Sequence, residues 1–299
     1  MFGFPASGLA LALVLAMALA TSACSGTGGP GGAAATTTTR PPPVYYLALG
    51  DSLAAGFQPI PDHPKGVVTD RGYADVLEST ERATRPGLTL VKLACPGETT
   101  TTMIKGGICH YGAGSQLSAA TDFLRSHARS MALVTIDIGA NNVDGCGTGG
   151  RVDVGCVARG VASLTSESST IYDHLRAAAP AGLRMVTMNL YDPYLAAYLE
   201  GPAGQALARA SLPLLRTVNA TIATVAGRHG VATADVAAAF DSYDLTATVP
   251  LAGHGTVPVA VARVCQLTWI CSPAPLGPNI HPDDAGYRVI AGALAPLTR

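Results

Sequence analysis

Short apolar runs alternate with longer stretches of helical periodicity along most of the chain. Five runs of strand length predict β-strands, at residues 44–50, 88–94, 132–140, 183–191 and 230–236. Five longer segments have apolar residues at helical spacing, at residues 73–83, 115–130, 157–179, 203–229 and 283–295. Apolar strands that alternate with helices are typical of a parallel sheet covered on both faces. The pattern therefore predicts a three-layer α/β/α sandwich around a central, mainly parallel five-stranded sheet.

The chain begins with a segment of a different kind. Residues 9–20, LALALVLAMALA, form an apolar run that is too short to span a bilayer as a mature helix but is typical of a signal peptide. Cys24 follows small residues, as the lipidated cysteine of a bacterial lipobox does. Lipidation of Cys24 and plain cleavage after Ala20 or Ala23 are both open. Residues 1–24 thus predict export to the extracellular space or the cell envelope, with a membrane anchor if Cys24 is lipidated.

Residues 25–44 separate the signal segment from the predicted fold. Gly, Ala, Thr and Pro dominate them and cannot build a core, so we expect a flexible tether. The remaining residues, 45–299, suit one α/β domain. The whole chain is 48% hydrophobic and 13% charged, with a net charge of −1, and its Lys and Arg residues are scattered. We therefore expect a globular protein without a nucleic-acid-binding surface. A monomer is the expected oligomeric state.

The cysteines support export. Besides Cys24 there are six, which allow 15 pairings. They fall into consecutive pairs separated by 14, 10 and 6 positions, and none has the Cys-x-x-Cys spacing of zinc or redox sites. Three local disulfides formed in an oxidising compartment are the economical interpretation, namely Cys95–Cys109, Cys146–Cys156 and Cys265–Cys271.

Four loops with polar residues are expected at the carboxyl edge of the sheet, where parallel sheets bind ligands. They are Gly50-Asp51-Ser52 after the first strand, CPGETT (95–100) after the second, GANN (139–142) after the third, and NIHPDDAGY (279–287) before the last helix. Taken singly, a Ser after Asp is a turn residue and a His before Pro is a surface residue. The chain has no zinc motif of the His-Glu-x-x-His type and no Gly-rich phosphate loop, so we expect neither metal nor cofactor.

Taken together and in order, the four blocks resemble the SGNH hydrolases, also called GDSL esterases and lipases, and in particular exported actinobacterial members. The resemblance spans residues 45–299 and implies a flavodoxin-like SGNH hydrolase fold. It rests on Gly50-Asp51-Ser52-Leu53, on Gly97, on Gly139-Ala140-Asn141 and on His281-Pro282.

The resemblance also implies roles for these residues. Ser52 is the expected nucleophile, and His281 is the expected base, because a free hydroxyl is a weak nucleophile until a base accepts its proton. Attack on an ester places negative charge on the carbonyl oxygen, which needs preorganised donors. The expected donors are the backbone N–H groups of Ser52 and Gly97 and the side-chain amide of Asn141.

Two positions depart from the family pattern. The family has Asp three residues before its histidine, where this chain has Pro278, and Asp after its oxyanion asparagine, where this chain has Asn142. Asp283 and Asp284 stand at a helix start, where acidic residues favour the helix dipole, so we expect them to be structural. We expect a main-chain carbonyl near Pro278 to orient His281 in a Ser-His dyad. A triad that uses one of the two aspartates is the alternative.

These features predict an exported, optionally membrane-anchored, serine esterase or lipase that acts on the carboxylic ester of a lipid or acylated glycan. A carbohydrate O-deacetylase would use the same Ser52 and His281. A non-catalytic envelope protein that binds acylated ligands is a further alternative, against which the joint presence of the four site residues argues. Asp192, after the fourth strand, is interpreted as a turn residue.

Overall fold

The computed structural model describes residues 42–148 and 151–299. The predicted signal peptide, the lipidation candidate Cys24 and most of the predicted tether lie outside these residues. Residues 42–299 belong to one compact unit. Its first strand starts at Val44, so the last residue assigned to the tether is part of the sheet.

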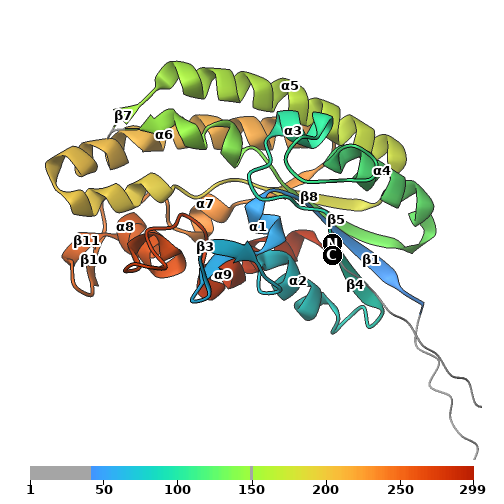
Figure 1. Ribbon diagram of the computed structural model, residues 1–299, viewed down its shortest axis with the longest axis horizontal. Coiled ribbons are helices and arrows are strands. Elements are labelled where there is room, and N and C mark those ends of the chain that lie inside the picture. The colour runs from blue at the N-terminus through green and yellow to red at the C-terminus, as the bar shows by residue number, and fades with distance from the viewer. Residues whose placement is uncertain (1–41, 149–150) are drawn as a thin grey trace, which may run out of the picture. The chain divides into compact units, whose positions relative to one another are not determined.

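Five parallel strands form the central sheet, in the spatial order β4-β1-β5-β8-β9. Figure 1 labels β4, β1, β5 and β8. The predicted parallel sheet is confirmed, although its fifth strand is shorter than the apolar run suggested. Leu47 of β1 is in register with Val91 of β4 and with Val134 of β5. Because all strands run the same way, their carboxyl ends meet at one edge. The strands are β1 (Val44–Gly50), β4 (Leu88–Lys92), β5 (Met131–Asp137), β8 (Arg184–Met188) and β9 (Ala232–Ala234).

Helices cover both faces of the sheet, as Figure 1 shows, and the side chains of β1 alternate between the two layers. Tyr46 and Ala48 pack in the layer of α2 and α9. Leu47 and Leu49 pack on the other face, with α4, α5 and the end of α6. None of the helices in the described residues is both long and apolar enough to cross a membrane. The main helices are α2 (Tyr73–Glu81), α4 (Gln116–Ser126), α5 (Val154–Ala178), α6 (Pro202–Arg228) and α9 (Asp284–Leu294).

Residues at the helix N-terminus set the starts of the two longest helices. α5 starts at Val154, before the apolar spacing begins, because the Asp153 carboxylate accepts a hydrogen bond from the Cys156 N–H at 3.0 Å. α6 starts at Pro202, since the fixed φ of proline suits the first helical position.

Smaller elements connect the main ones, and the apolar pattern did not predict them. One example, α8, has the sequence VAVARVCQL, whose β-branched residues favour strands. Burial of Ala260, Val261 and Val264 against the rest of the fold makes it a helix instead. These elements are α1 (Ser52–Ala55), β2 (Phe57–Ile60), β3 (His63–Val68), α3 (Thr100–Lys105), β6 (Gly147–Thr148), β7 (Arg151–Val152), α7 (Val236–Ala239), β10 (Thr248–Leu251), β11 (Gly255–Pro258) and α8 (Val259–Leu267).

Candidate active site

The first loop at the carboxyl edge turns from β1 directly into α1. Gly50 has a φ of +125°, and a Cβ there would lie 1.9 Å from the Asp137 carbonyl oxygen, so only glycine fits. Asp51 caps α1, because its Oδ1 accepts a hydrogen bond from the Leu53 N–H at 3.1 Å. Ser52 is the first residue of α1, so its N–H has no partner within the helix. The turn therefore leaves the Ser52 N–H available at the edge of the sheet.

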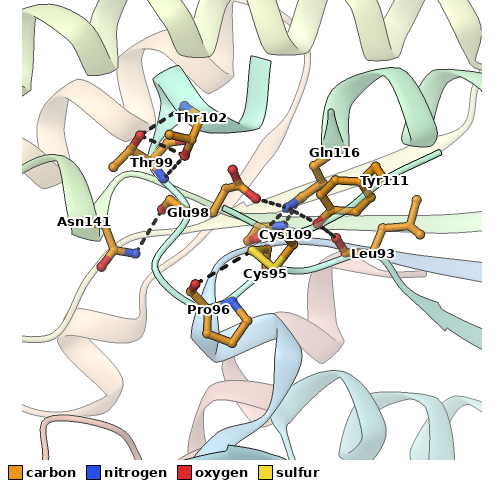
Figure 2. The surroundings of a disulfide bond; sticks show 11 residues. Leu93, Cys95, Pro96, Glu98, Thr99, Thr102, Cys109, Tyr111, Gln116 and Asn141 are labelled. Atoms are coloured by element: carbon orange, nitrogen blue, oxygen red, sulfur yellow. Dashed lines mark hydrogen bonds between the residues drawn. A yellow bond between two sulfur atoms is a disulfide. The ribbon is translucent and has the colours of Figure 1, made fainter. Parts of the chain in front are cut away.

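The second loop follows β4 and is held by a disulfide and by side-chain hydrogen bonds (Figure 2). Cys95 is bonded to Cys109, and Gln116 Nε2 donates to Glu98 Oε2 at 3.1 Å. Gly97 has a φ of +86°, and apart from its two chain neighbours no described residue has an atom within 4 Å of the place where a Cβ would stand. Within the described residues its N–H donates to no protein group. The loop therefore offers a second free N–H that a ligand can approach closely.

Gln116 joins the second loop to the first, and nothing in the sequence pattern singles it out. Its side chain is fully buried at the start of α4. Its Oε1 accepts a hydrogen bond from the Gly50 N–H at 2.7 Å, and its Nε2 donates to the Gly50 carbonyl oxygen at 2.9 Å. Because the same Nε2 also bonds Glu98, this one amide positions both loops relative to each other.

The third loop, after β5, brings two asparagines to the site. Asn141 Nδ2 donates to the Glu98 carbonyl oxygen at 2.9 Å (Figure 2) and, at a longer 3.3 Å, to Asp51 Oδ2. Asn142 Oδ1 accepts from the Thr100 N–H at 3.0 Å, and its Nδ2 donates to Thr100 Oγ1 at 2.6 Å. Asn142 therefore ties the third loop to the second. A substrate oxyanion at Asn141 would displace only the long contact with Asp51.

The ring of His281 is oriented by the side chain of Asn279, so the expectation of a main-chain carbonyl near Pro278 was wrong. His281 Nδ1 lies 2.7 Å from Asn279 Oδ1, and the His281 N–H donates to the same oxygen at 3.0 Å. This main-chain donor identifies the atom as the amide oxygen, so Nδ1 carries a proton and Nε2 is free to accept one. The turn before the histidine brings a side-chain carbonyl, rather than a main-chain one, to the ring.

Burial lowers the pKa of His281 to about 4. The Phe57 ring lies 4.8 Å from the imidazole, between ring centroids, and contributes to these apolar surroundings. The Asn279 amide is neutral, so it orients the imidazole and stabilises its charged form less than a carboxylate would. The ring is therefore neutral, and able to accept a proton, above about pH 4.

The two aspartates after Pro282 stabilise the helix start and the surface. Asp283 caps α9, because its Oδ1 accepts from the N–H groups of Ala285 and Gly286, both at 2.8 Å. Asp284 forms a half-exposed ion pair with Arg71 at 3.1 Å. These contacts match the structural role expected for both residues.

A pair of buried carboxyl groups lies next to the Ser52 turn. Asp51 and Asp137 are each 2% exposed and hydrogen-bond to each other. The Tyr73 hydroxyl and the Ala54 N–H donate to the two oxygens of Asp137, at 3.0 and 3.1 Å. Burial, followed by the neighbouring Asp51 charge, raises the pKa of Asp137 well above its usual value, and burial raises that of Asp51 to about 6. The higher of the two pKa values is that of Asp137, so of the pair Asp137 holds its proton more tightly and donates a hydrogen bond to Asp51.

The four predicted site residues, Ser52, Gly97, Asn141 and His281, line one pocket of about 450 Å³. Its size is in the range of small-molecule sites. The rest of the wall is mostly apolar and comes from β2, α5, α6 and the loops after β5 and β8, with Phe57, Val143, Val157, Leu190, Leu214 and Val218.

Ser52 and His281 face the same pocket, but the described residues contain no hydrogen bond between them. Ser52 Oγ lies 3.5 Å from Asp51 Oδ1, beyond the usual O–H···O distance. Catalytic contacts are often long in ligand-free sites and shorten when substrate binds. The geometry thus brings nucleophile and base candidates to one cavity without joining them.

Three carboxyl groups also line the pocket, those of Asp51, Asp144 and Asp192, whereas none of its described lining residues is Lys or Arg. Asp192 accepts from the Tyr194 N–H at 2.9 Å and from Ser211 Oγ at 2.6 Å, so it holds the turn after β8 as interpreted. Burial raises its pKa to about 6 and also raises that of Asp144. No cluster of three His, Cys, Asp or Glu side chains in the described residues could hold a metal ion.

Three disulfides join the cysteine pairs that the spacing predicts, Cys95–Cys109, Cys146–Cys156 and Cys265–Cys271. The second links the segment after Asn141 to the first turn of α5, at the pocket wall. The third closes the turn at Trp269, whose N–H donates to the His281 carbonyl oxygen at 3.0 Å. Each disulfide thus holds a segment that adjoins the pocket or its loops.

The chain can be compared with known proteins at the level of family and of fold. The model of the GDSL-like lipase/acylhydrolase family matches residues 48–289. The extracellular lipase of Streptomyces rimosus has a similar structure, with a TM-score of 0.54 and 20% identity over 85% of this chain and 99% of that chain. Phospholipase A1 of Streptomyces albidoflavus NA297 gives a TM-score of 0.53 and 21% identity over 85% and 98%. At this identity, these two likenesses show the shared fold. No protein with a curated description matches the chain. Because the family match spans most of the chain and includes all four loops, the chain belongs to the GDSL-like lipase/acylhydrolase family.

Proposed function

We propose that the protein is an exported serine esterase or lipase that hydrolyses carboxylic esters of acyl compounds. The observation that carries this proposal is the meeting of Ser52, Gly97, Asn141 and His281 around one mostly apolar pocket. Membership of a family of lipases and acylhydrolases supports the same reaction class.

In the proposed reaction, Ser52 Oγ attacks the carbonyl carbon of the ester while His281 Nε2 takes the hydroxyl proton. The hydrogen bond from His281 Nδ1 to Asn279 Oδ1 keeps His281 Nε2 as the atom that accepts the proton. Ser52 and His281 therefore form a dyad that a neutral amide orients. His281 then gives the proton to the departing alcohol, and water releases the acyl group from Ser52 by the reverse sequence.

Three hydrogen-bond donors stabilise the negative charge that develops on the carbonyl oxygen. The N–H groups of Ser52 and Gly97 donate to no group in the described part of the chain, so they bind the oxyanion without breaking a hydrogen bond seen there. Asn141 Nδ2 exchanges its long contact with Asp51 for the oxyanion. Each donor of this kind is typically worth about 3 to 4 kcal/mol of transition-state stabilisation.

The pocket wall favours an acyl chain over a sugar as the group bound there. Phe57, Val157, Leu214 and Val218 offer apolar surface, which suits a hydrocarbon chain and gives sugar hydroxyls no hydrogen-bond partner along this part of the wall. A carbohydrate O-deacetylase is therefore the less supported alternative. The carboxyl groups in the wall favour an uncharged ester over an anionic one.

Export is part of the proposal and rests on two features. Residues 1–24 have the pattern of a signal peptide, and the three disulfides suit an oxidising compartment. Mass spectrometry of the mature N-terminus from an actinobacterial host distinguishes a lipidated Cys24 from a chain cleaved after Ala20 or Ala23.

The test uses p-nitrophenyl esters graded by chain length and the variant Ser52→Ala. We expect kcat/KM to fall by about 10⁴-fold or more. The nucleophile and the base act as one unit, so the loss of the serine also makes the base ineffective. The matched control is Ser166→Ala, which removes an exposed serine of α5 and should leave kcat/KM unchanged. Retained hydrolysis in a folded Ser52→Ala variant would contradict the assignment. A wild-type protein that binds but never hydrolyses these esters would instead be an envelope binding protein.

A further inference from the structure

A second serine–histidine–aspartate arrangement lies between α5 and the end of α6. Ser169 Oγ is 2.9 Å from His229 Nε2, and His229 Nδ1 is 3.0 Å from Asp173 Oδ1. Ser169 and Asp173 are four residues apart on α5, so they lie on one face of the helix. Ser169 is about 18 Å along the helix axis from Val157 in the pocket wall, at 1.5 Å per residue. The arrangement is thus separate from the candidate active site.

The hydrogen bonds of this arrangement determine where its protons lie. The Asp173 carboxylate can only accept, so His229 Nδ1 carries a proton. In the neutral ring Nε2 then has a free lone pair, so the Ser169 hydroxyl donates to it. The hydroxyl proton of Ser169 already points at a base that a carboxylate orients, which is the geometry that activates a serine.

The histidine is also held in place through its main chain. Arg176 Nε donates to the His229 carbonyl oxygen at 3.1 Å, and Arg176 Nη2 donates to the Gly230 carbonyl oxygen. The His229 side chain is 15% exposed and that of Asp173 is 67% exposed. The base is therefore preorganised, while the arrangement remains open to solvent on the Asp173 side.

We propose that Ser169 is a second nucleophilic serine that takes up the acyl group of activated aryl esters. Ser169 Oγ forms a bond to the acyl carbon, the bond from that carbon to the phenolate oxygen breaks, the hydroxyl proton passes to His229 Nε2, and the phenolate leaves. Ser169 lies inside α5, where its own N–H is committed to the helix, so the oxyanion finds no counterpart of the Ser52 N–H. The reaction therefore needs a good leaving group, and the acyl ester accumulates on Ser169 instead of turning over.

The test uses the full chain with Ser52→Ala, so that the nucleophile proposed in the pocket does not contribute. The protein is treated with p-nitrophenyl acetate, digested and mapped by mass spectrometry. We expect acetylation of Ser169 to exceed that of Ser166 at least about tenfold, since a positioned base contributes roughly 10²- to 10⁴-fold. Ser166 is the internal control, because it is an exposed serine of the same helix whose hydroxyl donates to the Ala162 carbonyl oxygen.

Two further variants in the same background identify the base. His229→Gln should lower acetylation of Ser169 to the level of Ser166, and Asp173→Asn should lower its rate while preserving side-chain size. Thermal unfolding establishes whether each variant is folded. If His229→Gln does not fold, the labelling of Asp173→Asn decides whether the base is needed. Equal labelling of the two serines, or unchanged labelling of Ser169 in the folded variants, would overturn the proposal and leave the three side chains as a clamp between α5 and α6.

Discussion

Replacement of Asn279 by aspartate is predicted to raise the pKa of His281. In the native site burial lowers this pKa to about 4, and the partner of Nδ1 is a neutral amide oxygen at 2.7 Å. A carboxylate in its place attracts the imidazolium, and an opposite charge in contact shifts a pKa by about 1 to 3 units. At about 1.4 kcal/mol per unit, the new pair contributes roughly 1.4 to 4 kcal/mol. Two charges 4 Å apart interact by about 4 kcal/mol at an effective dielectric constant of 20, which agrees with the upper end.

The pH dependence of activity follows from the need for a neutral base. In the proposed reaction only neutral His281 accepts the Ser52 proton, so activity is lost as the pH falls through the pKa of His281. The acid limb of kcat/KM is expected near pH 4 in the native protein. In Asn279→Asp it should move up to between about pH 5 and pH 7. Well above that limb the variant should be at least as fast, because the carboxylate stabilises the imidazolium formed in the transition state.

The assay is the pH profile of kcat/KM for p-nitrophenyl butyrate at constant ionic strength. Asn279→Leu is the control, because it has a similar volume but no acceptor for the Nδ1 proton. Asn279→Leu should lose roughly 1 to 3 kcal/mol of transition-state stabilisation, which lowers kcat by about 5- to 150-fold. The acid limb of its pH profile should not move up. An acid limb that stays at its native position in a folded Asn279→Asp variant would refute the reasoning.

Three further predictions concern stability and specificity. Asp283→Asn and Asp284→Asn should leave kcat unchanged and lower the free energy of unfolding in urea by about 0.3 to 1 kcal/mol each, whereas a loss of about 100-fold in kcat would make one of them a triad member. Asp137→Asn should have the same melting temperature as the native protein, because the amide mimics the neutral acid. Asp137→Leu leaves buried donors unpaired and should lower the free energy of unfolding by about 1 to 3 kcal/mol. Equal melting temperatures for the two variants would argue against this. Joint replacement of Cys146 and Cys156 by serine should change the preference among p-nitrophenyl esters of graded length, since that disulfide holds a pocket wall; an unchanged profile would remove that role.

The central sheet could be predicted because burial on both faces leaves a continuous apolar signal in each strand. The position of the candidate site could be predicted for a similar reason, since the ends of parallel strands meet at one edge whatever the loops contain. Ser52, Gly97, Asn141 and His281 each lie in the short segment that follows a strand or precedes a helix, so local patterns locate them.

The residues that hold the site together could not be found in this way. Gln116 bonds to Gly50, which lies 66 residues earlier, and no local pattern contains that contact. The partner of His281 depends on whether a turn presents a main-chain or a side-chain carbonyl, and the sequence around Asn279 is compatible with both. The apolar pocket wall likewise draws on α5 and α6, whose side chains meet only in the folded protein.

The charge of the pocket bears on how the reaction ends. An ester enters uncharged, but in the proposed reaction its acyl part becomes a carboxylate anion. Asp51, Asp144 and Asp192 line the cavity without a described Lys or Arg, so this anion meets repulsion and finds no counter-ion. Above about pH 6, where Asp51 and Asp192 ionise, the repulsion is strongest. Product inhibition by the free acid should therefore be weak at neutral pH and increase as the pH falls, so that the wall that binds the substrate through its apolar surface expels the product through its charge.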